Sequence, residues 1–531
     1  MKRLHHRGPG AGKRCQHALC VALALTLAMG AAQLPAQTSS ALPGLGDGTA
    51  LSPAAERRMG DSIARYLYRD PDYLPDLVLM DYVDSIWQPL LAAARQRGEA
   101  LPAAEDLNAW VILLSRDRTV NAFALPGGYM GLHLGLIAAT QTRAELASVL
   151  AHELSHVTQR HIARNMNRQN GMAPWVLGAL VLGMLAASKG ADNAQGANAA
   201  IVGSQALAAQ SQLNYSRDME READRIGFAV LGEAGFSPQG FVDMFAVLQQ
   251  SGRLSDAGAF PYLRSHPLTT ERIADMQSRI GVDTPAQYIS RLTPDPGADW
   301  VPRLMAARAR VLMQPDPQVL AVWLAQAKDE AFQKQPDAQQ AGILYGATLS
   351  AMQLRDWPLA VSLFARLYER CRANPAAWEQ ARLLGAELAL TVGDTARARS
   401  LLDAATGVRT VSARTHVLLS AQALIRAAKA AQALGDLRAW LVDHPHDTVA
   451  WRLVSQAHAA LGNQVAAVRA EGEISALEQD AVAALDRMRA AQDLARAGKW
   501  GPGGPDYVEA SILDSRTREL GALARQQALE R

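Results

Sequence analysis

The sequence predicts a mainly α fold, in which an α+β domain with a small sheet is followed by an α-helical solenoid. Three observations support this. The 531 residues exceed one ordinary core, so about two to four domains are expected. Hydrophobic residues make up 49% and aromatic residues only 5%, which favours helices rich in alanine and leucine over a β-sandwich. Strand-like runs occur in the first half, whereas the second half shows few strand signals.

The first 36 residues have the parts of a secretory signal peptide. The apolar run Ala18–Ala32 follows a basic segment, and small residues near Ala32 and Ala36 offer cleavage points. An uncleaved anchor is the alternative, but the run is short for a hydrocarbon core of about 30 Å. We expect cleavage, and a polar tether over residues 37–52. The basic residues are Lys2, Arg3, Arg7, Lys13 and Arg14.

Charge and cysteine content exclude several classes of protein. Removal of residues 1–36 takes away five positive and no negative side chains, so the formal charge changes from +2 to about −3. The mature chain therefore lacks the basic character of a nucleic-acid binder. Cys15 and Cys20 leave with the signal, and Cys371 alone cannot form an intramolecular disulfide. Cys371 has no fixed histidine partner and is predicted to be a packed residue rather than a nucleophile.

Helical periodicity runs from about Pro53 to Arg97, and two short apolar runs follow. Trp110–Leu114 and Val120–Leu125 are separated by the charged turn Ser115–Thr119, which predicts two paired strands. Pro126–Gly128 should end the second strand, because proline and glycine interrupt regular pairing.

Pro174–Ala187 is the most apolar segment after the signal. Fourteen residues are short for a bilayer, so we expect a buried helix, with membrane-surface contact and spanning as alternatives. The Ala-, Gly-, Asn- and Gln-rich segment Lys189–Gln212 is expected to be a mobile loop or weak helix, of the kind that forms lids.

Internal repetition begins after about Asp299 and defines a predicted domain over residues 299–531. Three tripeptides each precede an alanine by the same interval, and Gly393 and Gly462 lie 69 residues apart, close to two periods of 34. The pattern predicts degenerate tetratricopeptide-like helix pairs, which stack into a surface for polypeptide partners. A plain helical bundle is the alternative. The tripeptides with their alanines are Leu354–Asp356 with Ala360, Val392–Asp394 with Ala398, and Leu461–Asn463 with Ala467.

The helix predicted from about Arg143 to Asn167 carries His-Glu-Leu-Ser-His. His152 and His156 are four residues apart, so both imidazoles lie on one face and suit one tetrahedral ion. Glu153 is placed to act on a metal-bound water without ligating the metal. This is the HExxH pattern of zinc hydrolases. The alternative is that these residues lie on a solvated helix face and bind no metal.

A third ligand must come from elsewhere. His161 does not fit the metzincin spacing, which requires glycine and histidine where Gln159 and Ile162 stand. Glu220 and Asp224 share a helix face in the segment 215–228. One interpretation is that Glu220 ligates the metal and Asp224 hydrogen-bonds a histidine ring, with the small Ala223 letting the two helices approach. A solvated acidic face is the alternative, and spacing alone favours it.

Four motifs in order resemble the HtpX-like and CAAX-prenyl-protease-like gluzincin metallopeptidases. They are Asn121–Met130, His152–His156, Glu220–Asp224 and Ser265–Arg272, and they cover roughly residues 105–280. The resemblance implies a zincin-type metallopeptidase domain over residues 53–290, with one Zn²⁺ per chain held by His152, His156 and Glu220. Glu153 would be the general base for peptide hydrolysis. The sequence does not distinguish zinc from another divalent ion.

The resemblance also brings His266 and Arg272 to the site. His266 would stabilise the oxyanion, or occupy the open zinc position and hold the enzyme inactive, or only bond a turn. Arg272 would stabilise the oxyanion or pair with an acidic residue. The strand containing Asn121, Ala122, Phe123 and Ala124 would bind substrate backbone as an added strand, unless it is an interior strand.

The family's multi-pass membrane members have strong transmembrane helices, which this chain lacks. A signal peptide, a peptidase domain and a repeat domain instead resemble periplasmic members of Gram-negative bacteria. That resemblance implies cleavage of misfolded or stalled outer-membrane proteins, assistance in their assembly, and repeats that bind substrates or the outer-membrane assembly machinery. A chaperone or scaffold with a closed or structural zinc site is the alternative, although an intact Glu153 favours the enzyme. Peripheral membrane contact through Pro174–Ala187 is compatible with either.

Overall fold

A computed structural model of the chain describes residues 51–100, 107–168, 216–253, 261–282, 300–403 and 413–529. The predicted signal peptide, most of the tether, the apolar segment Pro174–Ala187 and the loop Lys189–Gln212 lie outside the described residues. Within the described ranges, no helix combines the length and apolar character needed to cross a bilayer.

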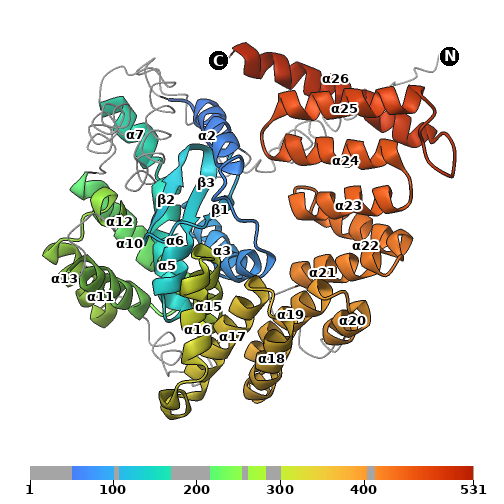
Figure 1. Ribbon diagram of the computed structural model, residues 1–531. Helices are drawn as coiled ribbons and strands as arrows, with labels where there is room; N and C mark the ends of the chain where they lie inside the picture. Colours follow the sequence, from blue (N-terminus) through green and yellow to red (C-terminus); the bar gives the residue numbers. More distant parts are fainter. Residues whose placement is uncertain are drawn as a thin grey trace, which may run out of the picture. The chain divides into compact units, whose positions relative to one another are not determined.

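A three-stranded sheet forms the β component of the first half (Figure 1). The strands β1 (Val111–Ser115), β2 (Ala122–Leu125) and β3 (Tyr129–His133) lie in the order β1-β3-β2. The predicted pairing of the first two strands is therefore wrong. The 3-10 turn η1 (Pro126–Gly128) ends β2 as predicted, but it also returns the chain as β3, which pairs antiparallel with β2 and parallel with β1.

Helices surround this sheet, and α6 lies among them at the centre. It contacts α3, α10, α11 and β2, and its residues from Glu145 to His156 are all buried. Burial on several sides explains why the helix lacks a clear amphipathic pattern. The helices of this half are α2 (Pro53–Tyr68), α3 (Leu77–Gln96), α5 (Leu134–Ala139), α6 (Arg143–Thr158), α7 (His161–Arg168), α10 (Arg217–Glu233), α11 (Gln239–Arg253), α12 (Pro261–Ser265) and α13 (Thr270–Val282).

Two long predicted helices are each divided in the structure. The segment Pro53–Arg97 forms α2 and α3, which begin at the side-chain caps Ser52 and Asp76. The segment predicted from Arg143 to Asn167 forms α6 and α7, because Arg160 between them adopts a φ of 51°. The first break contains Pro71 and Pro75, which interrupt a helix locally, whereas Arg160 at the second break is held by a hydrogen bond to the distant Glu56.

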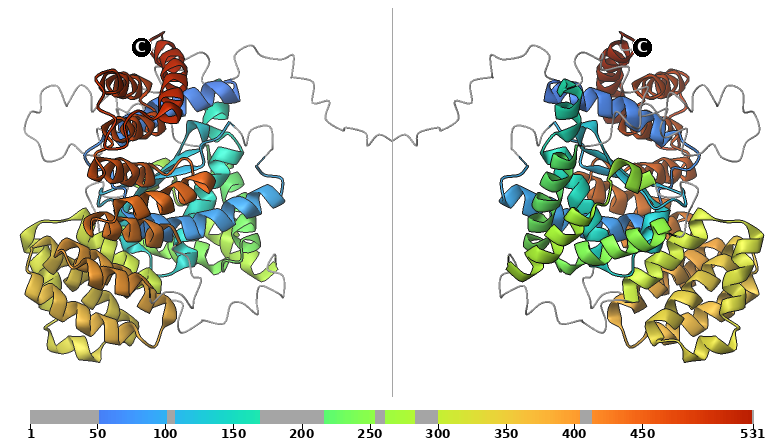
Figure 2. Two further views of the ribbon diagram at one scale, coloured as in Figure 1. Left: turned by 90° about the vertical axis from the view of Figure 1, so that its right-hand side faces the viewer. Right: turned by 90° about the vertical axis from the view of Figure 1, so that its left-hand side faces the viewer.

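The second half is helical, and its helices stack in chain order (Figures 1 and 2). The mainly α fold class is thereby confirmed. The described elements are α15 (Trp300–Met313), α16 (Pro317–Gln326), η2 (Glu330–Lys334), α17 (Asp337–Gln353), α18 (Trp357–Cys371), α19 (Pro375–Thr391), α20 (Thr395–Asp403), α21 (Ala413–Arg426), α22 (Ala430–Asp443), α23 (Thr448–Ala460), α24 (Gln464–Leu477), α25 (Ala481–Arg496) and α26 (Tyr507–Leu529).

The three repeated tripeptides are equivalent turns between helices. Each joins two helices of a pair, and its middle residue has a positive φ: 59° at Arg355, 85° at Gly393 and 76° at Gly462. Glycine adopts this conformation without steric cost, which accounts for two of the three positions. The alanines that follow the turns are buried, as close packing of paired helices requires. Cys371 is also buried, and burial raises its thiol pKa to about 12.

The two halves meet through buried polar groups. Arg308 on α15 bonds both oxygens of Asp76 at 2.7 and 2.8 Å and both oxygens of Glu387 at 2.7 and 2.8 Å. On α3, Asp81 accepts hydrogen bonds from the amide and hydroxyl of Thr415 at 2.9 and 2.6 Å. Helix α3 of the first half is thus bonded to two helices of the second half, α15 and α21.

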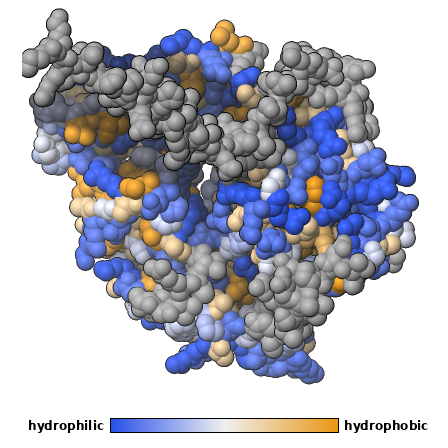
Figure 3. All heavy atoms as spheres, turned by 180° about the vertical axis from the view of Figure 1, so that it is seen from behind, coloured by the Kyte–Doolittle hydropathy of each residue, from blue (hydrophilic) through white to orange (hydrophobic). Residues whose placement is uncertain are grey.

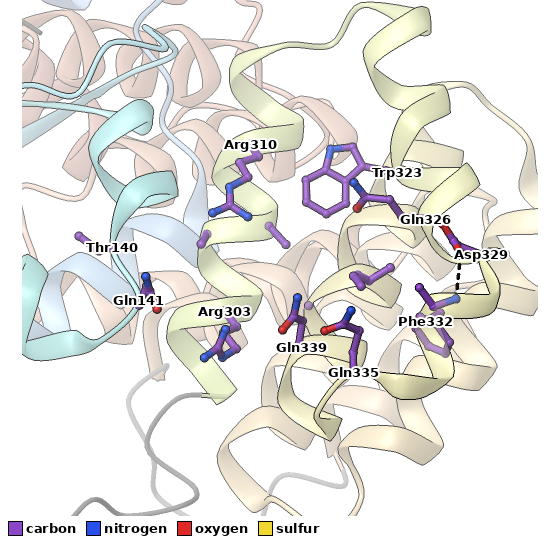
Figure 4. A pocket seen from close by; sticks show the side chains of 15 residues that line it. Thr140, Gln141, Arg303, Arg310, Trp323, Gln326, Asp329, Phe332, Gln335 and Gln339 are labelled. Carbon is purple, nitrogen blue, oxygen red and sulfur yellow. Dashed lines mark hydrogen bonds between the residues drawn. The ribbon is translucent and has the colours of Figure 1, made fainter. Parts of the chain in front are cut away.

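Beside this junction, a hollow of about 500 Å³ lies between the residues after α5 and the helices α15, α16 and α17 (Figure 4). Arginine, glutamine and tryptophan side chains line it, among them Arg303, Arg310, Trp323 and Gln339. On the face seen in Figure 3, the described surface is mainly hydrophilic, with small hydrophobic groups scattered over it.

Candidate metal centre

Helix α6 presents His152 and His156 to one point in the interior. Thr142 caps the helix by accepting from the amide of Glu145, and Leu146, Leu150 and Leu154 anchor the helix in the core. The two histidines are 1% and 0% exposed, and their Nε2 atoms lie 3.0 Å apart.

Helix α10 brings Glu220 opposite these histidines. The Oε1 and Oε2 atoms of Glu220 lie 3.5 Å from Nε2 of His156 and His152 respectively. The close approach of α10 to α6 depends on small residues. Ala223 is fully buried, and a Cβ on Gly227 would lie 3.1 Å from the backbone of Ala151. Gly227 was not predicted to matter from the sequence, although it stands one turn after Ala223 on the same face of α10.

His266, just after α12, enters the same cluster. Its Nδ1 lies 3.1 Å from Oε1 of Glu220 and 3.3 Å from Nε2 of His152. The ring of Tyr262 stacks on His266 with centroids 4.7 Å apart, and this supporting residue was not predicted. One ligand atom from each of His152, His156, Glu220 and His266 falls within 4.8 Å of every other.

The donor set fits a metal ion. Two imidazoles whose Nε2 atoms face each other can share only one proton, so the convergence of three imidazoles and a carboxylate is better satisfied by a cation. Imidazole nitrogen and carboxylate oxygen are ligands that Zn²⁺ accepts in tetrahedral sites. All four residues are at most 2% exposed, and burying such groups without partners would be costly.

A charged pair supports the cluster from behind. Oδ1 of Asp224 lies 2.9 Å from Nδ1 of His152, the ring nitrogen that faces away from the cluster. Arg272 holds Asp224 with two hydrogen bonds of 2.6 and 2.8 Å, and its Nη1 lies 2.8 Å from Oε2 of Glu220. Burial lowers the pKa of His152, but the contacts with Asp224 and Glu220 outweigh it and raise the pKa to about 9. The guanidinium of Arg272 thus contacts the carboxylates of both Asp224 and Glu220.

Glu153 joins the cluster to the sheet. Its Oε2 accepts a hydrogen bond of 2.9 Å from the amide of Ala124 in β2. Its Oε1 is buried without a hydrogen-bond partner among the described residues, 3.4 Å from Nε2 of His266. Burial raises the pKa of Glu153, so this carboxylate is a better proton acceptor than an exposed one. Among the described strands β2 is an edge strand, and its predicted residues Ala122 to Ala124 lie next to α6.

His161 and Glu222 complete the surroundings and were not assigned a role from the sequence. His161 lies outside the four-residue cluster, but its Nδ1 is 2.8 Å from Nδ1 of His156. Its Nε2 is 3.1 Å from Oε2 of Glu222, which Arg164 also bonds at 2.9 Å. Burial lowers the pKa of His161 to about 4. Its proximity to His156 depends on the break between α6 and α7, which the sequence did not reveal.

Known proteins are similar to this chain over the region that contains the site. Residues 87–280 match Peptidase family M48. The putative beta-barrel assembly-enhancing protease of Vibrio cholerae is 31% identical over 486 residues, which cover 90% of this chain and 93% of the relative. The beta-barrel assembly-enhancing protease of Escherichia coli is 30% identical over 455 residues, or 82% of this chain and 84% of the relative.

A more distant relative matches over a smaller region. The mitochondrial metalloendopeptidase OMA1 of Saccharomyces cerevisiae is 28% identical over 200 residues, or 36% of this chain and 54% of the relative. The predicted metallopeptidase class is confirmed by these matches and by the clustered histidines and glutamate. The chain belongs to Peptidase family M48, within the family of the beta-barrel assembly-enhancing proteases.

Proposed function

We propose that this metallopeptidase is a zinc-dependent endopeptidase that cleaves unfolded polypeptides. The observation that carries the proposal is the convergence of His152, His156 and Glu220, beside Oε1 of Glu153, which has no hydrogen-bond partner within the described part of the chain. A structural metal site has no need of a buried carboxylate oxygen left available for a proton. Zinc is favoured over magnesium or calcium because imidazoles outnumber carboxylates among the donors.

In this proposal His152, His156 and Glu220 hold the ion. Bound zinc supplies an activated water and polarises the peptide carbonyl. Glu153 accepts the proton of the attacking water at Oε1 and passes it to the leaving amine. Ala124 holds the other oxygen of Glu153 and so keeps the carboxylate aimed at the site. Asp224 orients His152, and Arg272 lowers the pKa of Asp224 through two hydrogen bonds, so Asp224 stays ionised.

His266 acts as a closing residue in this account. Its contacts with both Glu220 and His152 support a state in which the ring takes the position that water needs. Opening would then require movement of the segment after α12. Had His266 stabilised the oxyanion, a place beside the substrate carbonyl rather than among the ligands would be expected.

Substrate would bind along the edge of β2 that faces away from β3, where no other described strand pairs with it. The Ala124 amide points away from β3, since it bonds Glu153, so this edge faces the proposed metal site. An extended chain added there, alongside Asn121, Ala122, Phe123 and Ala124, would be recognised mainly through its backbone. Such binding favours unfolded chains and gives loose sequence preference.

The relatives' names suggest the biological setting. We infer that the chain acts in the periplasm on misfolded or stalled outer-membrane β-barrel proteins and assists their assembly. Residues 1–36 would be the cleaved signal, residues 37–52 a tether, residues 53–290 the peptidase domain and residues 299–531 a tetratricopeptide-like domain for substrates or the assembly machinery. Pro174–Ala187 would provide peripheral membrane contact.

The hollow beside α15 supports a polypeptide-binding role for the second domain. In Figure 4, Arg303 and Arg310 project from one helix, while Trp323, Gln326 and Gln339 come from its neighbours. Amides can bond a peptide backbone in both directions, and a tryptophan face accepts an apolar side chain. Arg310 donates to the carbonyl of Ala138 at 2.6 Å.

The closed position of His266 also favours a second candidate, a chaperone or assembly scaffold that rarely cleaves. To distinguish the endopeptidase from the scaffold, the protein is incubated with one outer-membrane β-barrel protein in its unfolded and in its folded form. We expect chelator-sensitive cleavage of the unfolded form, faster with His266→Ala. If neither protein cleaves the unfolded form and both delay its aggregation, the scaffold is correct.

A further inference from the structure

The two histidines of α6 are supported by different groups on the side away from the cluster. Nδ1 of His152 meets a carboxylate, Asp224, at 2.9 Å. Nδ1 of His156 instead meets a second imidazole, His161, at 2.8 Å. Nε2 of His161 continues to Glu222 at 3.1 Å, and Arg164 bonds the same carboxylate oxygen at 2.9 Å. A chain of hydrogen bonds thus runs from His156 to a carboxylate that is 28% exposed.

In this series of hydrogen bonds, each group can have only one role as donor or acceptor. A histidine that ligates a metal through Nε2 must carry its proton on Nδ1. His156 Nδ1 is then the donor, so Nδ1 of His161 must offer its lone pair. The proton of a neutral His161 ring must therefore lie on Nε2, where Glu222 accepts it. The donor and acceptor roles of the His156 and His161 ring nitrogens are therefore all determined.

A break in the helical backbone brings the rings of His156 and His161 together. In a continuous helix, residues five apart are turned by about 140° and point to different faces. His161 reaches His156 because the helix breaks at Arg160, whose φ of 51° is uncommon for a residue other than glycine. Arg160 is held there by hydrogen bonds to Glu56 at 2.7 Å and to the carbonyl of Leu51.

We propose that His161, backed by Glu222, is a positioning residue that fixes the tautomer and ring orientation of the metal ligand His156. This inference depends on the metal site of the proposed function. His161 is 0% exposed and lies outside the four-residue cluster of candidate ligands, and it reaches that cluster through its contact with His156. It corresponds in purpose to Asp224 behind His152, but uses an imidazole to carry the hydrogen bond to a carboxylate.

Three substitutions of His161 separate its two hydrogen bonds. His161→Leu removes both. His161→Asn keeps an acceptor oxygen near the Nδ1 position, facing His156, and His161→Gln keeps a donor near the Nε2 position, facing Glu222. His133→Leu is the matched control, because His133 is also buried in the peptidase half and bonded at Nδ1, to Thr119 at 2.8 Å, without touching the cluster.

The measurement is the Zn²⁺ dissociation constant of the full chain by chelator competition, with the melting temperature of the metal-free protein recorded alongside. We expect His161→Leu to bind Zn²⁺ about 10- to 100-fold more weakly. His161→Asn should stay close to the parent, His161→Gln should resemble the leucine variant, and His133→Leu should bind as the parent does. Glu222→Ala, at a partly exposed position, should weaken Zn²⁺ binding even if His161→Leu does not fold.

Several outcomes overturn the inference. Parent-like Zn²⁺ affinity in His161→Leu would show that His156 needs no support. Equal losses in the leucine, asparagine and His133→Leu proteins would show a general packing effect. If His161→Leu does not fold, parent-like affinity in Glu222→Ala would overturn it as well. A parent chain that binds no Zn²⁺ would instead refute the proposed function itself.

Discussion

At the scale of single residues, the candidate centre is a set of buried charges that depend on one another. Arg272 is 4% exposed and forms ion pairs with both Asp224 and Glu220. Removing one member of a buried charged set leaves its partners without compensation, which is more costly than losing a surface pair.

Arg272→Met should therefore lower the free energy of unfolding of the metal-free protein by about 3–5 kcal/mol, with a smaller loss when metal is bound to Glu220. Urea unfolding monitored by circular dichroism measures the change. Arg279→Met is the control, since Arg279 pairs with Asp275 near the surface and should contribute at most about 1 kcal/mol. Equal effects of the two substitutions would contradict this account.

Residue-scale prediction from the sequence reaches as far as local spacing does, and the roles assigned to the site residues stay predictions. His152, His156, Glu220 and Asp224 could be placed on helix faces, because residues four apart on a helix share a face. His161 could not be given a role, since its contact with His156 depends on a backbone break held by Glu56. Residues held together by tertiary contacts leave no periodic signal.

At the scale of elements, the position of the sheet depends on close contacts between backbones. Gly60 of α2 lies against η1, and a Cβ there would be 2.0 Å from the carbonyl oxygen of Pro126. No side chain fits at this contact without moving the turn that joins β2 to β3. The position of β2, the edge strand proposed to bind substrate, therefore depends on the close contact between Gly60 and the turn that follows this strand.

Gly60→Ala should destabilise the protein by about 1–3 kcal/mol through overpacking, although alanine favours helices. Gly435→Ala is the matched control, because nothing lies within 4 Å of a Cβ at that exposed position of α22. The control should gain about 0.5–1 kcal/mol. Thermal unfolding of both variants measures the difference, and a stabilised Gly60→Ala would show that the helix and turn are less tightly packed than described.

Elements were predicted well where their signal is contained in the segment. The helix of the HExxH motif, the turns at Gly393 and Gly462 and the stop at Pro126 all follow from local chemistry. The strand β3 and its place between β1 and β2 were missed. Strand pairing is a choice among distant partners, and the sequence Tyr129–His133 contains a glycine that weakens the strand signal.

At the scale of the whole molecule, buried polar groups join the two halves across long sequence separations. Asp76 and Arg308 are 232 residues apart, and Asp81 and Thr415 are 334 residues apart. No local pattern marks such pairs, so the junction could not be predicted. The second half is thus bonded directly to α3, which in turn packs against α6, the helix that carries the candidate centre.

The Asp81 contact should make stability depend on pH. Burial raises the pKa of Asp81 to about 6, from an ordinary value of 3.8, despite the hydrogen bonds from Thr415. A raised folded-state pKa gives stability that is complete below the unfolded value and is lost as the pH rises through about 6. Between pH 5 and pH 7 the parent should therefore lose about 1 kcal/mol more than Asp81→Asn.

Urea unfolding of both proteins at the two pH values measures this difference, and other titrating groups cancel in the comparison. The same pH response in the parent and in Asp81→Asn would show that Asp81 does not titrate in this range.

The central claim is that the cluster on α6 and α10 is a catalytic metal site with Glu153 as its base. The most direct measurement is the metal content of the purified chain and of Glu153→Gln, with cleavage of an unfolded protein assayed on the same samples. We predict about one zinc ion per chain in both proteins and cleavage by the parent alone, because Glu153 accepts a proton without ligating the metal. Absence of bound metal from both proteins after zinc is supplied, or equal cleavage by both, would contradict the account.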